Sequence, residues 1–84
     1  MNPRWKSKAK PASLEARFEF EDFSILRRFL DDLADQAERL EHHPNISFGR
    51  NHVSVIIYSQ AESLQDVDYA LADSIDAAFN GVMK

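Results

Sequence analysis

The chain has 84 residues, enough for one small domain that buries only about 60 to 65% of its unfolded surface, so oligomerisation is expected. A hydrophobic fraction of 44% excludes a disordered chain, and the absence of cysteine excludes disulfides, a thiolate nucleophile and a cysteine-based zinc site. No apolar run approaches the roughly 20 residues of a membrane span, and the N-terminus lacks the apolar core of a signal peptide, so we expect a cytoplasmic protein without membrane contact.

Basic residues are concentrated at the N-terminus. Four of the ten lie within residues 1–10, which contain no acidic residue, and this leaves six against 14 acidic side chains in the rest of the chain. An acidic body argues against nucleic acid as the main partner, because phosphate binding needs a basic surface. We expect residues 1–12 to form a basic arm ahead of a domain over residues 13–84. The arm is either a frayed terminus or a segment that docks on an acidic partner through Trp5 and Lys6.

A strand and a long helix are predicted after the arm. Apolar and charged residues alternate in the strand, which is typical of a half-buried antiparallel strand. Its apolar members are Leu14, Ala16, Phe18 and Phe20. The helix is predicted from about Ser24, its N-cap, to about Glu41, and Pro44 stops it at or just before the histidines that precede the proline. Its apolar stripe is Leu26, Phe29, Leu30, Leu33, Ala37 and Leu40.

The second half of the chain predicts a β-hairpin and a final helix. A short strand containing Ile46 and Phe48 leads through a turn at Arg50-Asn51 into a strand over residues 52–59. In that strand Val53, Val55 and Ile57 are predicted to face one side, and His52, Ser54, Ile56 and Tyr58 the other. The helix is predicted from about Leu64 to Asn80, with Leu64, Val67, Leu71, Ile75, Ala78 and Phe79 on one face and Asn80-Gly81 as its stop.

This order of elements predicts an α+β fold, an antiparallel sheet with both long helices on one face. Two helices on one face of the sheet leave the other face uncovered. Ile56 and Tyr58 are predicted to lie on that uncovered face. Large apolar side chains on an open sheet face favour contact with a partner subunit, and we include Tyr58 among the partner-binding residues.

The adjacent histidines His42 and His43 are the main candidates for chemistry. Neighbouring residues on a helix point about 100° apart, so the two do not form a zinc-binding pair, and we predict no metal site. The chain also lacks a G-x-S-x-G elbow and a phosphate-binding glycine loop. Imidazoles titrate near neutral pH and can donate and accept protons. The alternative is a structural helix end, where the dipole favours a cation.

Residues 13–79 resemble the pterin-4a-carbinolamine dehydratase family. The resemblance is strongest where Ala37 and Glu38 lead into His42-His43-Pro44. It implies an enzyme that removes water from 4a-hydroxytetrahydrobiopterin, giving quinonoid dihydrobiopterin, without a metal or other cofactor. It also implies homodimers, or tetramers made of two dimers, formed through the sheet.

The resemblance assigns catalytic roles to His42, His43 and Asp68, and places Pro44 beside the pterin. The family's third histidine falls on Gln60, whose amide can bind a substrate but cannot exchange a proton near neutral pH. His52 does not replace it, because it lies at the opposite end of the same strand, about 25 Å away at the rise of an extended chain. The family's N-terminal helix and a glycine in the loop after the strand are also missing.

A subgroup of the family, the short relatives associated with α-carboxysomes and implicated in Rubisco assembly, resembles the chain in these departures. The shared elements are Trp5-Lys6, Leu14 to Phe20, Phe29 to Ala34 and Ser47-Phe48-Gly49. We therefore favour a non-enzymatic Rubisco assembly factor with Rubisco subunits as partners and an association with the carboxysome. The alternative is an active dehydratase that uses the two histidines.

Overall fold

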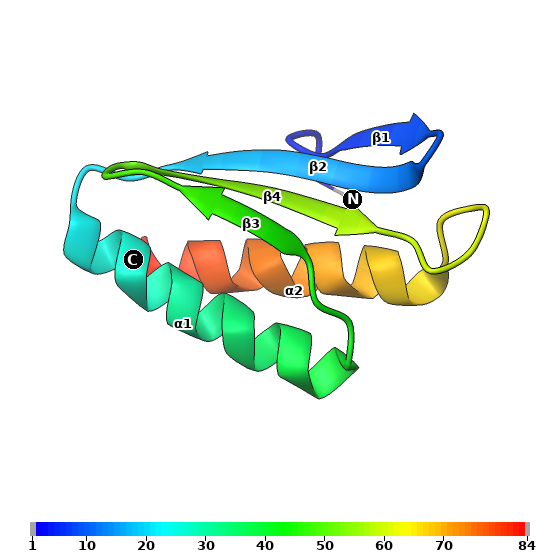
Figure 1. The fold of residues 1–84 in the computed structure, drawn as a ribbon. Coiled ribbons are helices and arrows are strands. Elements are labelled where there is room, and N and C mark those ends of the chain that lie inside the picture. The colour runs from blue at the N-terminus through cyan, green and yellow to red at the C-terminus, as the bar shows by residue number, and fades with distance from the viewer. Residues whose placement is uncertain (1, 84) are drawn as a thin grey trace.

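A four-stranded antiparallel sheet forms one layer of the molecule, and two long helices cover one of its faces (Figure 1). The computed structural model describes residues 2–83. In chain order the elements are β1 (Lys6–Ala9), β2 (Ala12–Glu19), α1 (Phe23–Leu40), β3 (Asn45–Phe48), β4 (His52–Tyr58) and α2 (Asp66–Val82). The strand order is β1-β2-β4-β3. The predicted α+β class, with both helices on one face, is confirmed.

The central strands β2 and β4 supply the floor of the core. Leu14 pairs with Ile57, Ala16 with Val55, and Phe18 with Val53, and all six side chains are buried. Their neighbours along each strand point to the opposite face, as period-two alternation requires. The predicted faces of both strands are therefore confirmed.

The helix boundaries differ from the predicted ones at three points, one of which is the start of α2 at Asp66 and not at about Leu64. Asp22, not Ser24, caps α1: its side chain accepts the Ser24 N–H at 2.7 Å. The backbone of Asp22 is extended, as an N-cap requires, whereas Ser24 already lies within the helix. The helix α2 continues past Asn80 and Gly81 to Val82, which is 5% exposed. Burial of Val82 against the core outweighs the local tendency of glycine to end the helix.

The apolar face of α2 also differs from the predicted stripe. Val67 is 37% exposed, whereas Asp68 and Asp76 are buried on the side that faces the core. The spacing of apolar residues predicted that Val67 faces the core, whereas in the structure the carboxylates of Asp68 and Asp76 are buried there. Each carboxylate has a specific partner, which is what permits its burial.

One of these partners is Trp5, which lies in the core. Its Nε1–H donates to both Asp76 oxygens, at 3.0 and 3.1 Å, and the side chain is T-stacked on Phe18. The Arg4 guanidinium lies over the rings of Phe18 and Phe79, 5.0 and 4.8 Å from their centroids, and its Nε is 3.5 Å from Asp76. The first residues are therefore held by hydrogen bonding, ion pairing and cation–π contact at once.

The basic arm expected over residues 1–12 is thus built into the domain. Residues 6–9 are the strand β1, paired in register with β2, and the boundary expected at residue 12 falls inside this hairpin. With an exposed fraction of 5%, Trp5 is not placed to anchor a partner. Burial of a large aromatic side chain in the core lowers the free energy of the folded protein, whereas an exposed ring would lose this stabilisation.

The turn between β3 and β4 brings Gly49 close to a side chain. A Cβ atom on Gly49 would lie 2.6 Å from His52 Cε1, so another residue at this position would require the imidazole to move. His52 begins β4, at the end of the strand remote from Gln60, as predicted.

Asp76 predicts a pH-dependent contribution to stability. Burial raises the pKa of its carboxyl above the ordinary 3.8, more than the Trp5 hydrogen bond and the Arg4 charge lower it. The folded protein therefore holds this proton more tightly than the unfolded chain. Relative to Asp76→Asn, which cannot titrate but keeps an acceptor oxygen for Trp5, the wild type should be most stable below pH 3.8 and lose this advantage as pH rises through the raised pKa.

Urea denaturation of both proteins across this range measures the difference. Asp35→Asn, at an exposed position on α1, serves as the control and should show no comparable trend. A difference between wild type and Asp76→Asn that stays constant or grows with pH would contradict the expected sign.

Candidate active site at the facing helix ends

The end of α1 turns sharply and separates the two adjacent histidines. Glu41 adopts a left-handed conformation with φ 51°. The His42 N–H donates to the Ala37 carbonyl at 3.1 Å, and the Glu41 N–H donates to the Glu38 carbonyl at 3.2 Å. This is the Schellman arrangement, in which a reversed chain satisfies the last carbonyls of a helix. The predicted helix end just before the histidines is confirmed, and the reversal directs His42 toward α2.

His42 and Asp68 form a buried contact between the two helices. The His42 Nε2 and Asp68 Oδ1 atoms are 2.6 Å apart, and the residues are 4% and 0% exposed. Since a carboxylate only accepts, His42 donates from Nε2, and Nδ1 is the ring nitrogen not committed to Asp68. The second oxygen of Asp68 accepts the backbone N–H of Gln65 at 2.8 Å. Asp68 thus caps its own helix and holds the end of the other.

His43 lies in a different environment. Its Nε2 is 3.2 Å from Glu38 Oε2, and the two side chains are 65% and 81% exposed. An ion pair in water at such exposure contributes little to stability. The two histidines therefore point apart, as predicted, although both lie beyond the end of α1 and the left-handed Glu41, not the geometry of a helix, separates them. One is enclosed by protein and the other is solvated.

Gln60 lies in the loop that joins β4 to α2 and is exposed. The Ser59 hydroxyl braces this loop by donating to the Ser63 carbonyl at 2.7 Å and accepting the Ala61 N–H at 3.1 Å. Pro44 is partly exposed directly after the histidines. The loop leads directly into α2, and His42 reaches the start of the same helix through Asp68 (Figure 1). Of the residues assigned by resemblance, the structure therefore places His42 and Asp68 in contact.

The capping role of Asp68 was not predicted from the sequence. A glutamine three residues before an aspartate at a helix start is a variant of the capping box, and this pattern was the available signal. Within residues 2–83 there is no group of three or more His, Asp or Glu side chains placed to hold a metal ion. In the same part of the chain, no helix is long and apolar enough to cross a membrane.

The predicted partner-binding residues lie apart from this site. Lys6 and Tyr58 are exposed on the outer face of the sheet, on β1 and β4, with β2 between them. Trp5 is on the opposite, buried side. The structure therefore separates Trp5 from the other two, and any shared partner surface would contain only Lys6 and Tyr58.

Comparison with known proteins identifies the class to which this fold and site belong. Residues 1–78 match the family described as pterin 4 alpha carbinolamine dehydratase. The chain belongs to this family. A relative from Synechococcus sp. strain WH7803, provisionally named a pterin-4-alpha-carbinolamine dehydratase, is 38% identical over 76 residues, which cover 89% of this chain and 80% of the relative.

Two solved structures share the fold. One is a pterin dehydratase-like protein identified as a RuBisCO assembly factor in the alpha-carboxysome; it has a TM-score of 0.81, is 34% identical, and the match covers 89% of this chain and 88% of that one. The other is a transcriptional coactivator/pterin dehydratase from Brucella melitensis, with a TM-score of 0.82, 26% identity, and coverage of 90% and 82%. The predicted family is therefore confirmed.

The two histidines should differ in their effect on stability. His42→Ala removes the partner of a buried carboxylate, and we expect it to lower the free energy of unfolding by about 2–4 kcal/mol. His43→Ala removes an exposed pair and should change it by less than about 0.5 kcal/mol. Urea denaturation followed by circular dichroism measures both, and equal losses would contradict the described geometry.

Proposed function

We propose that this chain is a Rubisco assembly factor of the α-carboxysome, built on the pterin dehydratase fold and without dehydratase activity at an enzymatic rate. One observation carries the proposal: the chain is 34% identical to a protein identified as such a factor, over 89% of its own length and 88% of the other. The two chains thus match almost end to end. In this proposal the client is a Rubisco subunit.

Gln60 supports the loss of catalysis. Dehydration needs one group to remove a ring proton and another to protonate the departing hydroxyl. The resemblance places a third histidine of the enzymes at this position, and an amide cannot supply the proton transfer. Loss of one acid/base group typically lowers a rate by about 10² to 10⁴-fold.

The presence of His42 has a structural explanation. His42 joins the end of α1 to the start of α2 through Asp68, and this contact stabilises the fold whether or not a pterin binds. His42 is therefore expected even in a protein that has lost the chemistry. His43, exposed beside Glu38, has no such structural role to preserve it.

An active dehydratase is the second candidate. In its favour, His42-His43-Pro44 is intact and Asp68 touches one histidine of the pair. The relatives provisionally named as dehydratases, at 38% and 36% identity, also favour it. In this reading His42 and His43 share the acid and base roles, Asp68 orients His42, and Gln60 only binds the substrate.

One substitution distinguishes the two candidates. The wild type should convert the pterin carbinolamine no faster than the uncatalysed background, while Gln60→His should raise the rate if the rest of the site persists. Gln36→His, which adds an imidazole on α1 far from this loop, is the matched control and should have no effect. Dehydration is followed by absorbance, with each protein at equal concentration.

The same proteins should be tested for Rubisco assembly. Co-purification with Rubisco large subunits and the yield of assembled enzyme should depend on the wild-type chain and survive Gln60→His, which changes a single exposed side chain in the loop after β4. Wild-type turnover at enzymatic speed that collapses in His43→Ala would establish the dehydratase instead. Inactivity in both assays would reject both candidates.

We further propose that the homodimer forms through the free edge of β3. This strand reads Asn45-Ile46-Ser47-Phe48, without a charged residue, and its Ile46 and Phe48 side chains are 39% and 55% exposed. The other edge strand, β1, carries Lys6 and Lys8. Charged edges resist pairing, whereas an uncharged apolar edge favours it. Two such dimers would make the tetramer that the family resemblance allows.

Charge placed on β3 should dissociate the dimer. Ile46→Lys puts an ammonium into the proposed interface, and we expect a shift to monomer in light scattering coupled to gel filtration. Lys6→Glu at the opposite edge is the control and should leave the dimer intact. A dimer that persists in Ile46→Lys but dissociates in Lys6→Glu would place the interface at β1.

A further inference from the structure

The strand β1 has one paired edge and one free edge. It pairs with β2 and is the terminal strand in the sheet order, so in the described chain no strand lies on its other side. In an antiparallel strand, alternate residues direct their backbone N–H and C=O groups away from the partner strand. The outer edge of β1 therefore offers unpaired donors and acceptors to an incoming segment (Figure 1).

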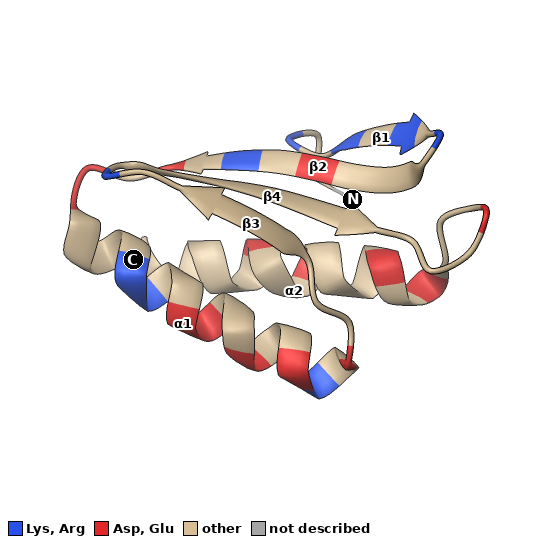
Figure 2. Ribbon diagram, viewed as in Figure 1, with Lys and Arg blue, Asp and Glu red and all other residues tan. Residues whose placement is uncertain are grey.

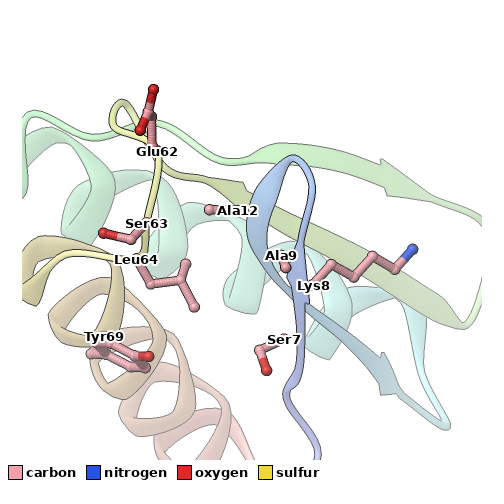
Figure 3. Close-up of a pocket in the computed structure, with 8 residues that line it drawn as sticks. All are labelled: Ser7, Lys8, Ala9, Ala12, Glu62, Ser63, Leu64 and Tyr69. Carbon is pink, nitrogen blue, oxygen red and sulfur yellow. The ribbon is translucent and has the colours of Figure 1, made fainter.

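A hollow lies beside this edge on the helix side of the sheet. It has a volume of about 470 Å³ and is bounded by β1, the loop before α2 and the first turns of that helix. The lining residues are Ser7, Lys8, Ala9, Ala12, Glu62, Ser63, Leu64 and Tyr69 (Figure 3). Leu64, the two alanines and the ring of Tyr69 give it an apolar lining with a polar rim.

The opposite side of the same edge is basic. Lys6 pairs in register with Glu15, and Lys8 with Ser13, whose neighbours on β2 face the core. The two lysines therefore belong to the outer face of the sheet. Figure 2 shows the basic residues along β1. Lys8 Nζ is 3.4 Å from Glu15 Oε2, but these side chains are 63% and 39% exposed, so the pair is weak.

We propose that the free edge of β1 binds an extended peptide segment of a partner protein, in which apolar and acidic residues alternate. An added strand presents successive side chains to opposite faces. The side chains on the inner face would enter the hollow lined by Leu64 and Tyr69, and those on the outer face would meet Lys6 and Lys8. This inference rests on the edge, the hollow and the charge, and does not depend on the function proposed above.

Charge also excludes a second copy of the chain as the occupant. Pairing β1 with β1 of another copy would bring the lysines of both strands together, and like charges on neighbouring strands repel. An acidic segment is the occupant that the edge attracts. Glu62 on the rim of the hollow disfavours an acidic side chain on the inner face, which fixes the acidic positions to the outer one.

The test uses the full chain and synthetic peptides with blocked ends. The first peptide alternates valine with glutamate; a second replaces glutamate with lysine, and a third replaces valine with serine. We expect the first to perturb the backbone amide resonances of Ser7, Ala9, Leu64 and Tyr69. We expect the other two to bind at least about tenfold more weakly, since each lacks one of the two recognition elements.

Substitutions in the protein test the same elements. Lys6→Glu with Lys8→Glu should reverse the preference, so that the lysine peptide binds more tightly than the glutamate peptide. A glutamate at position 6 would lie opposite Glu15, and one at position 8 would replace the lysine that pairs with Glu15. The neutral pair Lys6→Gln with Lys8→Gln is therefore a milder variant, which should weaken binding of the glutamate peptide without a reversal. Arg27→Glu with Arg28→Glu, two exposed positions on α1, is the charge-matched control for the double glutamate variant and should bind as the wild type does.

Two results would overturn the proposal. One is equal binding of the glutamate and lysine peptides. This would mean that Lys6 and Lys8 do not select an acidic partner and serve only to prevent β1 from pairing with other strands. The other is a set of perturbed resonances at residues 45–48, which would place peptide binding on β3 instead. Loss of Rubisco assembly without any change in peptide binding would concern the proposed function and leave this inference standing.

Discussion

One buried polar contact, between His42 Nε2 and Asp68 Oδ1, ties the end of one long helix to the beginning of the other. Both groups are removed from water, so each depends on the other to replace lost hydration. The left-handed residue Glu41 is what delivers the imidazole to this position. The loop after β4 leads directly into α2, so its position depends on where the contact between His42 and Asp68 holds the start of that helix. The geometry of the candidate site is therefore a consequence of how the two helices are joined.

This arrangement bears on how a motif should be interpreted within the family. An imidazole that holds two helices together is retained for folding, even where the reaction has been lost, so its presence alone does not identify an enzyme. A residue that does not stabilise the fold is a better indicator of whether the enzymatic activity is present. Gln60 is such a position, since it is exposed in a loop that the Ser59 hydroxyl braces independently. A family whose relatives bear both enzymatic and assembly descriptions is best divided at positions of this kind.

The strands, the helix faces and the α+β class could be predicted from the sequence, because each depends on a local pattern of apolar residues. The burial of Trp5 could not, since its partner Asp76 is 71 residues away and no local pattern connects them. The end of α2 was missed for a related reason: Val82 is fixed by the core and not by its neighbours. For the site, the histidines were predicted to point apart on a helix, but the reversal at Glu41 separates them after the helix has ended. The family resemblance singled out Asp68, whereas its contacts with His42 and Gln65 could be found only from the structure.

The hydrogen bond between Trp5 and Asp76 joins residues that are 71 positions apart in the chain. During synthesis Trp5 leaves the ribosome well before α2, so the indole stays in water until that helix has emerged. The strand β1, which follows Trp5 directly, is held in place from both sides only after α2 has packed against the sheet. Until that moment the nascent chain exposes a large aromatic group, and transiently exposed apolar surface of this kind makes folding intermediates prone to aggregate.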